Sequence, residues 1–460
     1  MIRFFFNVCY AFLLLIFLPF LLYAACFKGK YREGFGEKFL GNAPRLPKAA
    51  TRRVWVHAVS VGEVNLAASI LKEFERRHPD FEFVLSTTSK TGMELARKKF
   101  PNRTVFYAPL DFSWAVSRAL RRIQPDFLVL VELELWPNLL LTAQKRSVPV
   151  IVMNGRLGEK SFRNYSRVRP LLRPILRSLS LVTTQDETGA DHFRTLGTRP
   201  ERVINVGSIK YDGAQSDRQN EKTRRLAALW EIRPEDRIFL AGSTQDPEEA
   251  MAVEVFRRLR PEHPELRLIL VPRHPERFSD VARLLEKSEF SFCRRSEITA
   301  PEPAPTSAST SASTSDSTSA SDSAPDSAST HREPILLVDT IGELGGWWGT
   351  SSVGFVGGSM GTRGGQNMLE PAAFGTPVSF GPNTWNFRDI VSALLTHDAA
   401  VVVRDTEELT DFVRRCLEDA AYAQTLGSNA AALVASQQGA LRKTLDLFDQ
   451  FHETNFEQKS

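Results

Sequence analysis

The stretch D-T-I-G-E-L-G-G-W-W-G-T-S-S-V-G-F-V-G-G-S-M-G-T-R-G-G-Q-N-M-L-E, from Asp339 to Glu370, carries the local pattern that decides the fold. A short apolar run at 353–356 ends in the glycine pair 357–358, and a second glycine pair stands at 364–365. Apolar run, glycine-rich loop and helix-compatible residues, in that order, predict a strand, a loop and a helix. Strand, loop and helix in succession are the unit from which α/β sheets are built.

Two interpretations of this loop stay open from its residues alone. Glycines allow a ligand to approach the backbone, and the N–H groups that start a helix can bind a phosphate. The carboxylate of Glu370 can accept hydrogen bonds from a ribose diol. A tight loop capped by Asn367 explains the same residues, because glycine loops are common and a single one is weakly specific.

The same pattern recurs on both sides of this stretch. Apolar or β-branched runs lie at 54–59, 83–86, 127–131, 149–153, 181–184 and 203–206, and then at 238–241, 266–271, 335–338, 376–380 and 399–403. Strands that alternate with helices predict parallel sheets with right-handed crossovers. The polar stretch 213–237 separates the two series. We therefore predict an α/β protein with two Rossmann-like domains that face a cleft.

Length and composition agree with a globular protein of several domains. The chain has 460 residues, of which 42% are hydrophobic and 24% charged. A net charge of +4 is only mildly basic, and we expect no nucleic-acid partner. The four cysteines lack the spacing of a metal site, so we expect free thiols, no metal and no cofactor. Nothing in the sequence indicates an oligomeric state.

The N-terminal segment is apolar enough to meet a membrane. No charged residue stands between Phe4 and Cys26, a length of about 23 residues where roughly 20 cross a bilayer core. Basic residues are more numerous after the segment than before it, which favours a cytoplasmic body. We predict a single-pass N-terminal transmembrane anchor over residues 1–30. A helix that lies in the membrane interface is the alternative.

Two domains are expected after the anchor, an N-terminal one over 31–215 and a C-terminal one over 216–460. Residues 300–330 are almost entirely Ser, Ala, Thr and Pro, with a few Asp. Such a segment cannot bury enough apolar surface to offset its ordering entropy, so we predict a disordered insertion in the C-terminal domain.

Polar residues repeatedly follow the predicted strands. Glu63 stands where the first strand leads into a helix, and Glu132 and Glu134 follow the strand at 127–131. Ligands of open α/β sheets bind at this carboxyl edge. A first-turn glutamate that stabilises the helix dipole is the alternative for Glu63. Glu132 and Glu134 are expected to share one face of an extended segment.

Arg273 and His274 follow the strong strand at 266–271. Arginine is always charged and can bind a phosphate through two hydrogen bonds, and a histidine beside it can orient it or contact a base. A solvated turn accounts for the same pair.

Seven motifs give the chain its resemblance to a known family, the 3-deoxy-D-manno-octulosonic acid (Kdo) transferases of lipopolysaccharide assembly. They are H-A-V-S-V-G-E (57–63), E-L-E-L-W-P-N (132–138), N-G-R-L (154–157), G-S-I-K-Y-D (207–212), P-R-H-P-E-R-F (272–278), D-T-I-G-E-L (339–344) and G-G-Q-N-M-L-E (364–370). They follow in the family's order and span nearly the whole chain, so they are specific jointly although each alone is weak.

The resemblance implies a GT-B fold and an inverting, metal-independent glycosyltransferase. It implies CMP-Kdo as the donor, bound by the C-terminal domain, and a lipid A precursor (lipid IVA) as the acceptor, bound by the N-terminal domain. It also implies a place at the cell inner membrane, with the catalytic domains on the cytoplasmic side.

Site residues carry over from the matching motifs. Glu63 matches the general base, and Glu134 and Lys210 match residues that stabilise the transition state. The CMP-binding segments correspond to Arg273, His274, Ile341, Gly342, Glu343, Asn367, Met368, Leu369 and Glu370. Met368 stands where a proline is common in the family, and the Ser/Ala-rich insertion separates two of these segments.

Two other functions are compatible with the sequence. One is a membrane-anchored GT-B transferase that uses a UDP-sugar and another acceptor. The other is a non-catalytic sugar-nucleotide-binding protein, although the presence of Glu63, Glu134 and Lys210 together argues against it.

Overall fold

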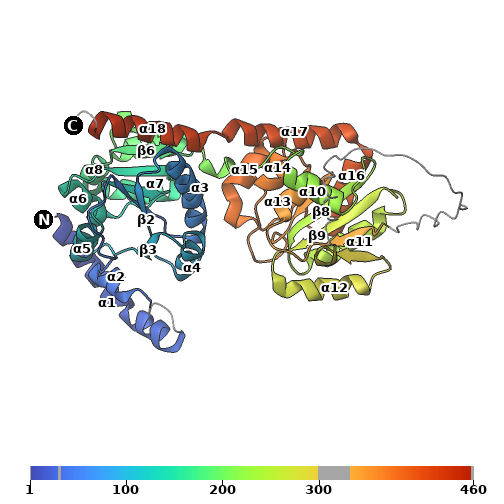
Figure 1. Ribbon diagram of the computed structural model, residues 1–460, viewed down its shortest axis with the longest axis horizontal. Helices are drawn as coiled ribbons and strands as arrows, with labels where there is room; N and C mark the ends of the chain where they lie inside the picture. The colour runs from blue at the N-terminus through green and yellow to red at the C-terminus, as the bar shows by residue number, and fades with distance from the viewer. Residues whose placement is uncertain (1, 29–32, 299–331, 457–460) are drawn as a thin grey trace, which may run out of the picture. The chain divides into compact units, whose positions relative to one another are not determined.

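The computed structural model describes residues 2–28, 33–298 and 332–456. It divides into two compact units (Figure 1). The first comprises Met1–Gly213 and Gln437–Ser460, and the second Ala214–Ser436. The predicted insertion at 300–330 lies outside the described residues.

The first unit is built on a seven-stranded sheet in the order β3-β2-β1-β4-β5-β6-β7. All of its strand pairs are parallel. Its strands are β1 (Arg53–His57), β2 (Glu82–Thr87), β3 (Thr104–Tyr107), β4 (Phe127–Val131), β5 (Val150–Gly155), β6 (Leu181–Thr184) and β7 (Val203–Asn205). Parallel strands covered on both faces are continuously apolar, which is why the runs stand out in the sequence.

Helices cover both faces of this sheet. They are α1 (Ile2–Lys28), α2 (Phe35–Leu40), α3 (Val61–Arg77), α4 (Lys90–Lys99), α5 (Ser113–Ile123), α6 (Pro137–Lys145), α7 (Glu159–Arg167), α8 (Arg169–Leu176), α9 (Glu187–Leu196) and α18 (Ala440–Phe456), with a short 3₁₀ helix η2 (Ile209–Tyr211). The predicted N-terminal helix is confirmed. Its window Arg3–Phe20 has a mean hydropathy of 1.9 and passes, by length and composition, as a membrane-crossing segment.

The second unit repeats the design with the strand order β10-β11-β9-β8-β12-β13-β14, again all parallel. Its strands are β8 (Arg237–Thr244), β9 (Leu266–Pro272), β10 (Phe292–Arg294), β11 (Ile335–Leu337), β12 (Val353–Val356), β13 (Val378–Phe380) and β14 (Val401–Val402). The α/β fold of two Rossmann-like units, predicted from the alternating pattern, is confirmed.

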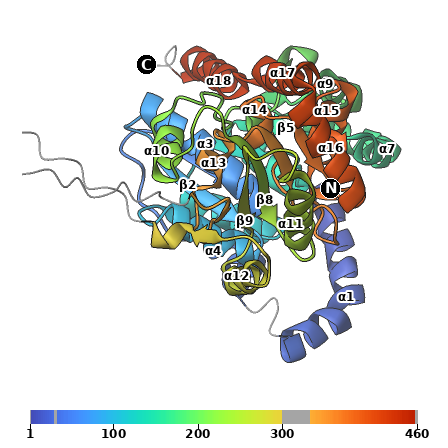
Figure 2. The same ribbon diagram turned by 90° about the vertical axis from the view of Figure 1, so that its right-hand side faces the viewer.

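The helices of the second unit are α10 (Glu221–Leu229), α11 (Glu248–Leu259), α12 (Phe278–Glu286), α13 (Leu344–Trp348), α14 (Leu369–Ala373), α15 (Arg388–Thr396), α16 (Thr406–Glu418) and α17 (Ala420–Gln437). Helix α11 packs against α16, and α10 against α13 (Figure 2).

Helix α13 lies close to the sheet because two strand glycines make room for it. A Cβ on Gly242 of β8 would lie 2.5 Å from the ring of Trp348, and a Cβ on Gly354 of β12 would lie 2.8 Å from the same ring. Any side chain there would displace the tryptophan. The glycines therefore fix α13, and with it the segment 341–343 that precedes the helix.

The last helix differs from the expected domain range. The sequence placed it in the C-terminal domain over 216–460, whereas the structure assigns Gln437–Ser460 to the first unit. The reason is hydrophobic burial. Phe448 of α18 is fully buried, with its ring centroid 4.8 Å from that of Phe74 and 5.2 Å from that of Phe127.

Candidate active site

Four charged side chains gather at the carboxyl edge of the first sheet. Glu63 lies in the first turn of α3, directly after β1, and Glu132 and Glu134 follow β4, the strand that pairs with β1. Lys210 lies in η2 after β7. The backbone N–H of Ile209 donates to the side-chain oxygen of Asn154 at 2.9 Å, which ties η2 to the end of β5.

Glu63 is held by the start of its own helix. Its carboxylate accepts hydrogen bonds from the N–H of Val59 and from the hydroxyl of Ser60, both at 2.8 Å. Ser60 in turn caps the helix by accepting from the N–H of Glu63. Burial, and then the nearby charge of Glu132, raise the pKa of Glu63, and the hydrogen bonds from Val59 and Ser60 oppose that rise. Glu63 is thus a helix-start residue and also a carboxylate of increased basicity.

Glu134 has the more strongly shifted carboxyl group. Burial raises its pKa to about 7, and the charges of Glu63 and Glu132 add to the effect. The indole N–H of Trp136 donates to one carboxylate oxygen at 2.7 Å and acts in the opposite direction. At neutral pH this group is therefore divided between its protonated and ionised forms.

His57, at the end of β1, lies behind Glu134. Its Nε2 is 4.0 Å from a carboxylate oxygen of Glu134, and its Nδ1 is 2.9 Å from the hydroxyl oxygen of Ser86. Burial lowers the pKa of His57 to about 4, so the ring is neutral and the contact with Glu134 is no ion pair. The hydroxyl of Ser86 also accepts from the indole N–H of Trp55 at 2.7 Å. These buried hydrogen bonds hold His57 in position next to Glu134.

Lys210 forms an ion pair with Glu132, at 2.7 Å between Nζ and Oε1. The expectation that Glu132 and Glu134 share one face of an extended segment is wrong. Glu132 has φ 61°, in the left-handed region, which breaks the alternation of an extended strand. Glu132 consequently contacts Lys210, while Glu134 contacts Trp136.

In the second unit, Glu370 and Asn367 contact each other at the start of α14. The amide of Asn367 donates to a carboxylate oxygen of Glu370 at 3.1 Å, and its oxygen accepts from the N–H of Leu369 at 3.2 Å. Burial raises the pKa of Glu370, and the positive charges of Arg273 and Lys222 partly offset this. The structure thus brings Arg273 into the electrostatic neighbourhood of Glu370. His274 beside it is exposed.

The segment 341–343 offers mainly backbone groups. The side chain of Ile341 is 79% exposed. Gly342 has φ 88°, and its carbonyl accepts from the ammonium group of Lys222 at 2.6 Å. The carboxylate of Glu343 is already engaged by Arg295, through two hydrogen bonds of 2.9 Å.

Met368 and Leu369 are 0% and 3% exposed, so their side chains belong to the core. A ligand can meet these two residues only through the backbone. A methionine in place of the common proline is accommodated because the side chain fills the interior.

The glycine loop after β12 is held by a residue that the sequence did not single out. The buried carboxylate of Glu248 accepts from the N–H groups of Gly358, Ser359 and Met360 at 2.7–2.9 Å, and from that of Gln245 at 2.8 Å. Successive N–H groups of this kind form an anion-binding concavity. Here the bound anion is an internal side chain, so these N–H groups are not available to a phosphate.

A neighbouring carboxylate supports the loop that carries Arg273 and His274. Glu249 is 1% exposed and accepts two hydrogen bonds from Arg277, at 3.0 and 3.2 Å. The pair Glu248-Glu249 follows Pro247 directly in the sequence. Two adjacent acidic residues that are both buried need partners, but the sequence does not reveal which partners they have.

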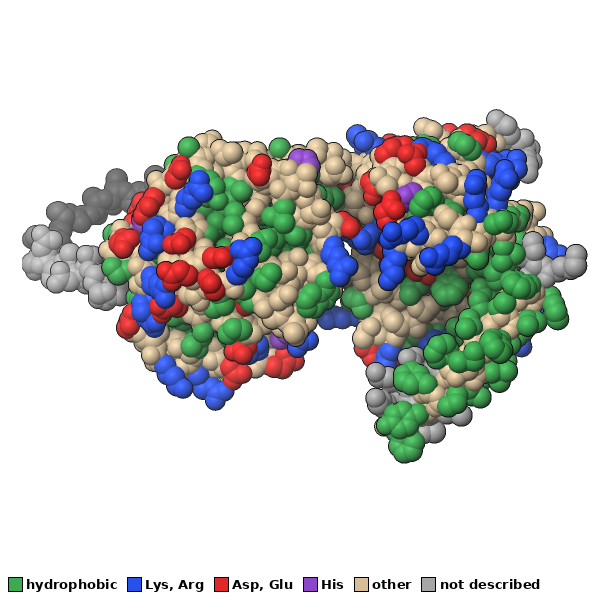
Figure 3. Space-filling model, turned by 180° about the vertical axis from the view of Figure 1, so that it is seen from behind, with side chains coloured by type: hydrophobic (Ala, Val, Ile, Leu, Met, Phe, Trp, Pro, Cys, Tyr) green, Lys and Arg blue, Asp and Glu red, His purple; other side chains and the backbone are tan. Residues whose placement is uncertain are grey.

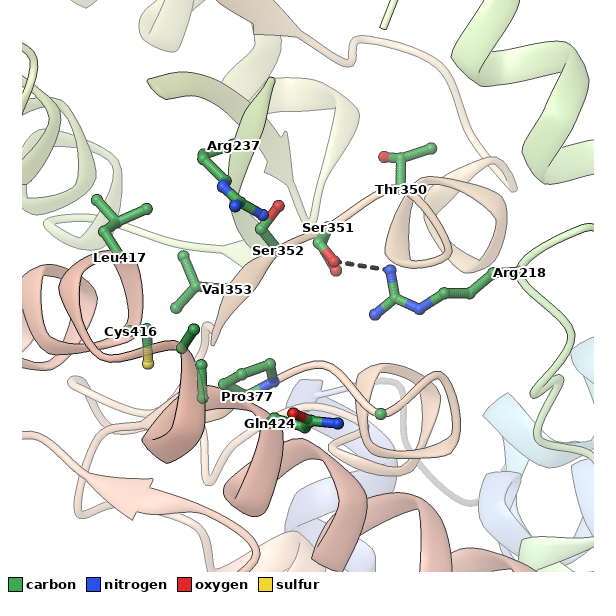
Figure 4. A pocket seen from close by; sticks show the side chains of 13 residues that line it. Arg218, Arg237, Thr350, Ser351, Ser352, Val353, Pro377, Cys416, Leu417 and Gln424 are labelled. Carbon is green, nitrogen blue, oxygen red and sulfur yellow. Dashed lines mark hydrogen bonds between the residues drawn. The ribbon is translucent and has the colours of Figure 1, made fainter. Parts of the chain in front are cut away.

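A cavity of about 330 Å³ in the second unit lies away from these residues (Figure 4). Arg237 and Val353, which begin β8 and β12, line it, so it lies at the amino edge of the sheet. The guanidinium of Arg218 donates there to the carbonyls of Ser351, Gly349 and Phe374 at 2.8–3.1 Å and joins loops together. No predicted site residue lines this cavity.

The chain is similar to known proteins over nearly its whole length. Residues 32–213 match the family model described as 3-deoxy-D-manno-octulosonic-acid transferase. The chain is 32% identical over 458 residues to the 3-deoxy-D-manno-octulosonic acid transferase of Haemophilus influenzae, covering 97% of this chain and 99% of that relative. It is 30% identical over 414 residues to the enzyme of the same name from Bordetella pertussis, covering 88% and 89%.

Among solved structures, the chain resembles one described as a UDP-N-acetylglucosamine 2-epimerase from Listeria monocytogenes. The TM-score is 0.52 at 11% identity, and the match covers 89% of this chain and 98% of the other. At this identity the likeness speaks for the fold alone. It agrees with a GT-B arrangement of two parallel-sheet units in one chain.

Proposed function

Since the chain belongs to the 3-deoxy-D-manno-octulosonic acid transferase family of glycosyltransferases, we propose that it transfers Kdo from CMP-Kdo to a lipid A precursor. Family membership confirms the resemblance found in the seven motifs. The observation that carries the proposal is the cluster of Glu63, Glu134, Glu132 and Lys210 at one sheet edge.

Glu63 is the proposed general base. Its carboxylate removes the proton from the acceptor hydroxyl, and the oxygen attacks the anomeric carbon of Kdo. The bond from that carbon to the phosphate oxygen breaks, CMP takes the electron pair, and the configuration inverts. A base works best when its pKa lies near the working pH, and burial moves Glu63 in that direction.

Glu134 and Lys210 are the proposed stabilisers of the transition state. Kdo carries a carboxylate, and the ammonium group of Lys210 can meet that charge or the charge that develops on the departing phosphate. Glu134, with a pKa of about 7, can donate a hydrogen bond in its protonated form. Donor contacts then replace or share the contact of Lys210 with Glu132.

The second unit is the proposed donor-binding unit. Arg273 would bind the phosphate, and Glu370 would accept hydrogen bonds from the ribose, with Asn367 holding its carboxylate in place. His274 would contact the nucleotide from the same loop. The exposed segment 341–343 and the backbone at 368–369 would complete the CMP contacts.

We place the protein at the cell inner membrane, attached through α1, with both units on the cytoplasmic side. The support is the apolarity of α1 and the excess of basic residues after it. A lipid-linked acceptor requires the enzyme to work at a membrane surface.

The base assignment is tested with Glu63→Gln in a transfer assay with labelled CMP-Kdo and lipid A precursor. We expect the turnover to fall by about 10²- to 10⁴-fold, the usual contribution of a general base. Glu73→Gln is the matched control. Glu73 lies on the same helix and pairs with Arg76 and Arg77 near the surface, so this variant leaves Glu63 and its hydrogen bonds in place and should retain transfer. Wild-type turnover by a folded Glu63→Gln protein would contradict the assignment.

The donor assignment is tested by calorimetry. CMP should bind more tightly than UDP, and substitution of Arg273 by Ala should weaken CMP binding. Stronger binding of UDP would favour a UDP-sugar transferase. Mass spectrometry of the product formed from CMP-Kdo and lipid A precursor identifies the reaction directly.

A further inference from the structure

The first ten residues of α1 are part of the first unit's fold. Phe6 is 9% exposed and belongs to the same hydrophobic cluster as Trp55 and Leu139. The side-chain amide of Asn7 donates to the hydroxyl of Ser113 at 2.7 Å, and its oxygen accepts from the N–H of Ser113 at 3.0 Å. The same oxygen accepts from the amide of Asn138 at 3.1 Å.

Tyr10 makes the last of these contacts. Its hydroxyl donates to the carboxylate of Asp111 at 3.0 Å. Asp111 is 7% exposed and also accepts from the N–H groups of Asn138 and Leu139, at 2.9 and 2.8 Å, at the start of α6. Positions 3, 6, 7 and 10 lie on one face of the helix, so the sequence of α1 provides a single face that contacts the first unit. Separation would leave buried polar groups without partners.

The chain returns to the same part of the first unit after α1. The carboxylate of Glu33 accepts from the hydroxyl of Tyr107 at 3.0 Å and pairs with Lys90 at 2.6 Å. Glu37 accepts from the N–H of Tyr107 at 2.9 Å. Tyr107 and Asp111 are four residues apart, so one segment, 107–113, holds the chain on both sides of the apolar part of α1.

The apolar part of α1 is too short to cross a membrane and return. Between Tyr10 and Glu33 stand 22 residues. One crossing of a bilayer core of about 30 Å takes roughly 20 residues in a helix, and a crossing with a return takes twice that number. A segment held on one side at both of its flanks therefore cannot span the membrane.

Exposed apolar side chains lie on α1 and also beyond it. Phe4, Phe12 and Leu15 are 74%, 63% and 66% exposed, and the hydrophobic side chains of α1 form a continuous surface at the lower right of Figure 3. Ring contacts through the buried Phe112 link α1 to Trp114. Tyr10 meets Phe112 edge-on at 6.2 Å, and Phe112 stacks on Trp114 at 4.5 Å between ring centroids.

Trp114 is itself exposed and contacts α2. Its indole N–H donates to the carbonyl of Phe39 at 3.0 Å, and Phe39 stacks on Phe35 at 4.6 Å. Trp114 and Phe35 are 52% and 58% exposed. Exposed aromatic rings with one polar end are typical of the membrane–water interface. A lipid layer is the occupant that fits such a surface, because basic residues also stand on both sides of the apolar segment, Arg3 before it and Lys28, Lys30 and Arg32 after it.

We propose that α1 enters only the leaflet that faces the catalytic units, with its first ten residues docked on the first unit, and does not cross the bilayer. The inference rests on the proposed membrane attachment and replaces the single-pass anchor predicted from length and hydropathy. It places the N-terminus on the same side of the membrane as the C-terminus.

Protease accessibility of terminal tags tests the proposal. The full-length protein would carry one epitope tag at each end, and tag digestion would be followed in right-side-out and inside-out vesicles of a bacterial host. We expect both tags to be lost together in inside-out vesicles and both to survive in right-side-out vesicles. Digestion of the N-terminal tag in right-side-out vesicles, with the C-terminal tag intact, would overturn the proposal.

A crosslink tests the docking itself in the same vesicles. Asn7→Cys with Ser113→Cys, in a Cys9→Ser background, should react with a short thiol crosslinker. Phe5→Cys with Ser113→Cys is the matched control, because Phe5 is 51% exposed and lies on the opposite helix face. Equal crosslinking of the two pairs, or of neither, would overturn the docked arrangement.

Two further readouts separate this inference from the proposed function. Release of the wild-type protein by alkaline carbonate would overturn the membrane insertion while Kdo transfer by the released protein still supports the enzyme. Loss of transfer by the wild-type protein, with the tags on one side and the crosslink formed, would overturn the proposed reaction and leave the placement of α1 supported.

Discussion

At the scale of single residues, the first sheet edge combines three carboxylates with one ammonium group. Burial is the main cause of the raised pKa values of Glu63 and Glu134, and the like charges nearby add to it. Glu132 forms an ion pair with Lys210. This ion pair reduces the negative charge of the carboxylate cluster at the edge of the sheet.

Glu132→Gln is predicted to shift the pH dependence of transfer to lower pH. The charge of Glu132 raises the pKa of Glu63 and of Glu134, so its removal should lower both. Lys210 would also lose its partner, and kcat should fall about tenfold, or ~1.4 kcal/mol in the barrier. The measurement is kcat against pH for both proteins. A lower kcat at every pH, with no shift of the pH profile, would contradict the electrostatic role of Glu132 and indicate a structural one.

Glu134→Gln is predicted to stabilise the protein at alkaline pH. The folded-state pKa of Glu134 is about 7, against 4.5 in the unfolded chain, so the fold binds this proton more tightly. Wild-type stability is therefore lost as pH rises from 4.5 through 7, and glutamine escapes this loss. The gain at pH 8 should be on the order of 2 kcal/mol, after allowance for partial exposure, and close to zero near pH 4.5. Urea denaturation at the two pH values measures it, and equal gains at both would contradict the shift.

At the scale of elements, the glycine loop is organised by a carboxylate that stands more than a hundred residues earlier in the chain. Glu248→Gln keeps the shape but replaces one acceptor oxygen with an N–H donor. It should loosen the loop between β12 and α14, raise the KM for CMP-Kdo, and cost about 2 kcal/mol.

The control for this prediction lies on the same helix. Glu254 of α11 pairs with Arg257 and Arg258 at the surface, and Glu254→Gln should cost less than about 1 kcal/mol and leave KM unchanged. Thermal melting and calorimetry with CMP separate the two variants. Unchanged CMP binding by Glu248→Gln would show that the loop does not support the donor site.

The elements themselves follow closely from the sequence, whereas their contacts do not. Continuous apolar runs reveal buried parallel strands, and the polar residues after them mark the ligand edge. That Lys210 selects Glu132, or that Glu248 fills the loop after β12, depends on contacts between distant segments, which leave no local pattern. The left-handed conformation of Glu132 is equally hidden, because nothing in E-L-E-L marks it.

At the scale of the whole molecule, the two parallel sheets were predictable and the path of the last helix was not. An amphipathic helix at the end of a domain packs on that domain in most proteins. The burial of Leu445 and Phe448 in the core of the first unit, and the ion pairs of Arg77 with Asp446 and Asp449, show that α18 belongs to the first unit.

Phe448→Ala is predicted to destabilise the first unit by about 3–5 kcal/mol, the usual cost of removing a buried phenylalanine. Gln450→Ala, at an exposed position of the same helix, is the control and should be nearly neutral. Hydrogen exchange should rise in β1 and β4 and stay unchanged in β8 and β9. An increase confined to the second unit would contradict the assignment of α18.

Because α18 packs on the first unit, the fold of that unit cannot be completed until the end of the chain has been synthesised. At about 5–20 residues per second, the first unit waits tens of seconds between the synthesis of β7 and the arrival of its closing helix. During that time, while the second unit is being synthesised, Phe74 and Phe127 lack the ring that covers them. Glu63 and Glu134, the carboxylates proposed to be catalytic, therefore lie in a unit whose fold is completed only when the chain is almost entirely translated.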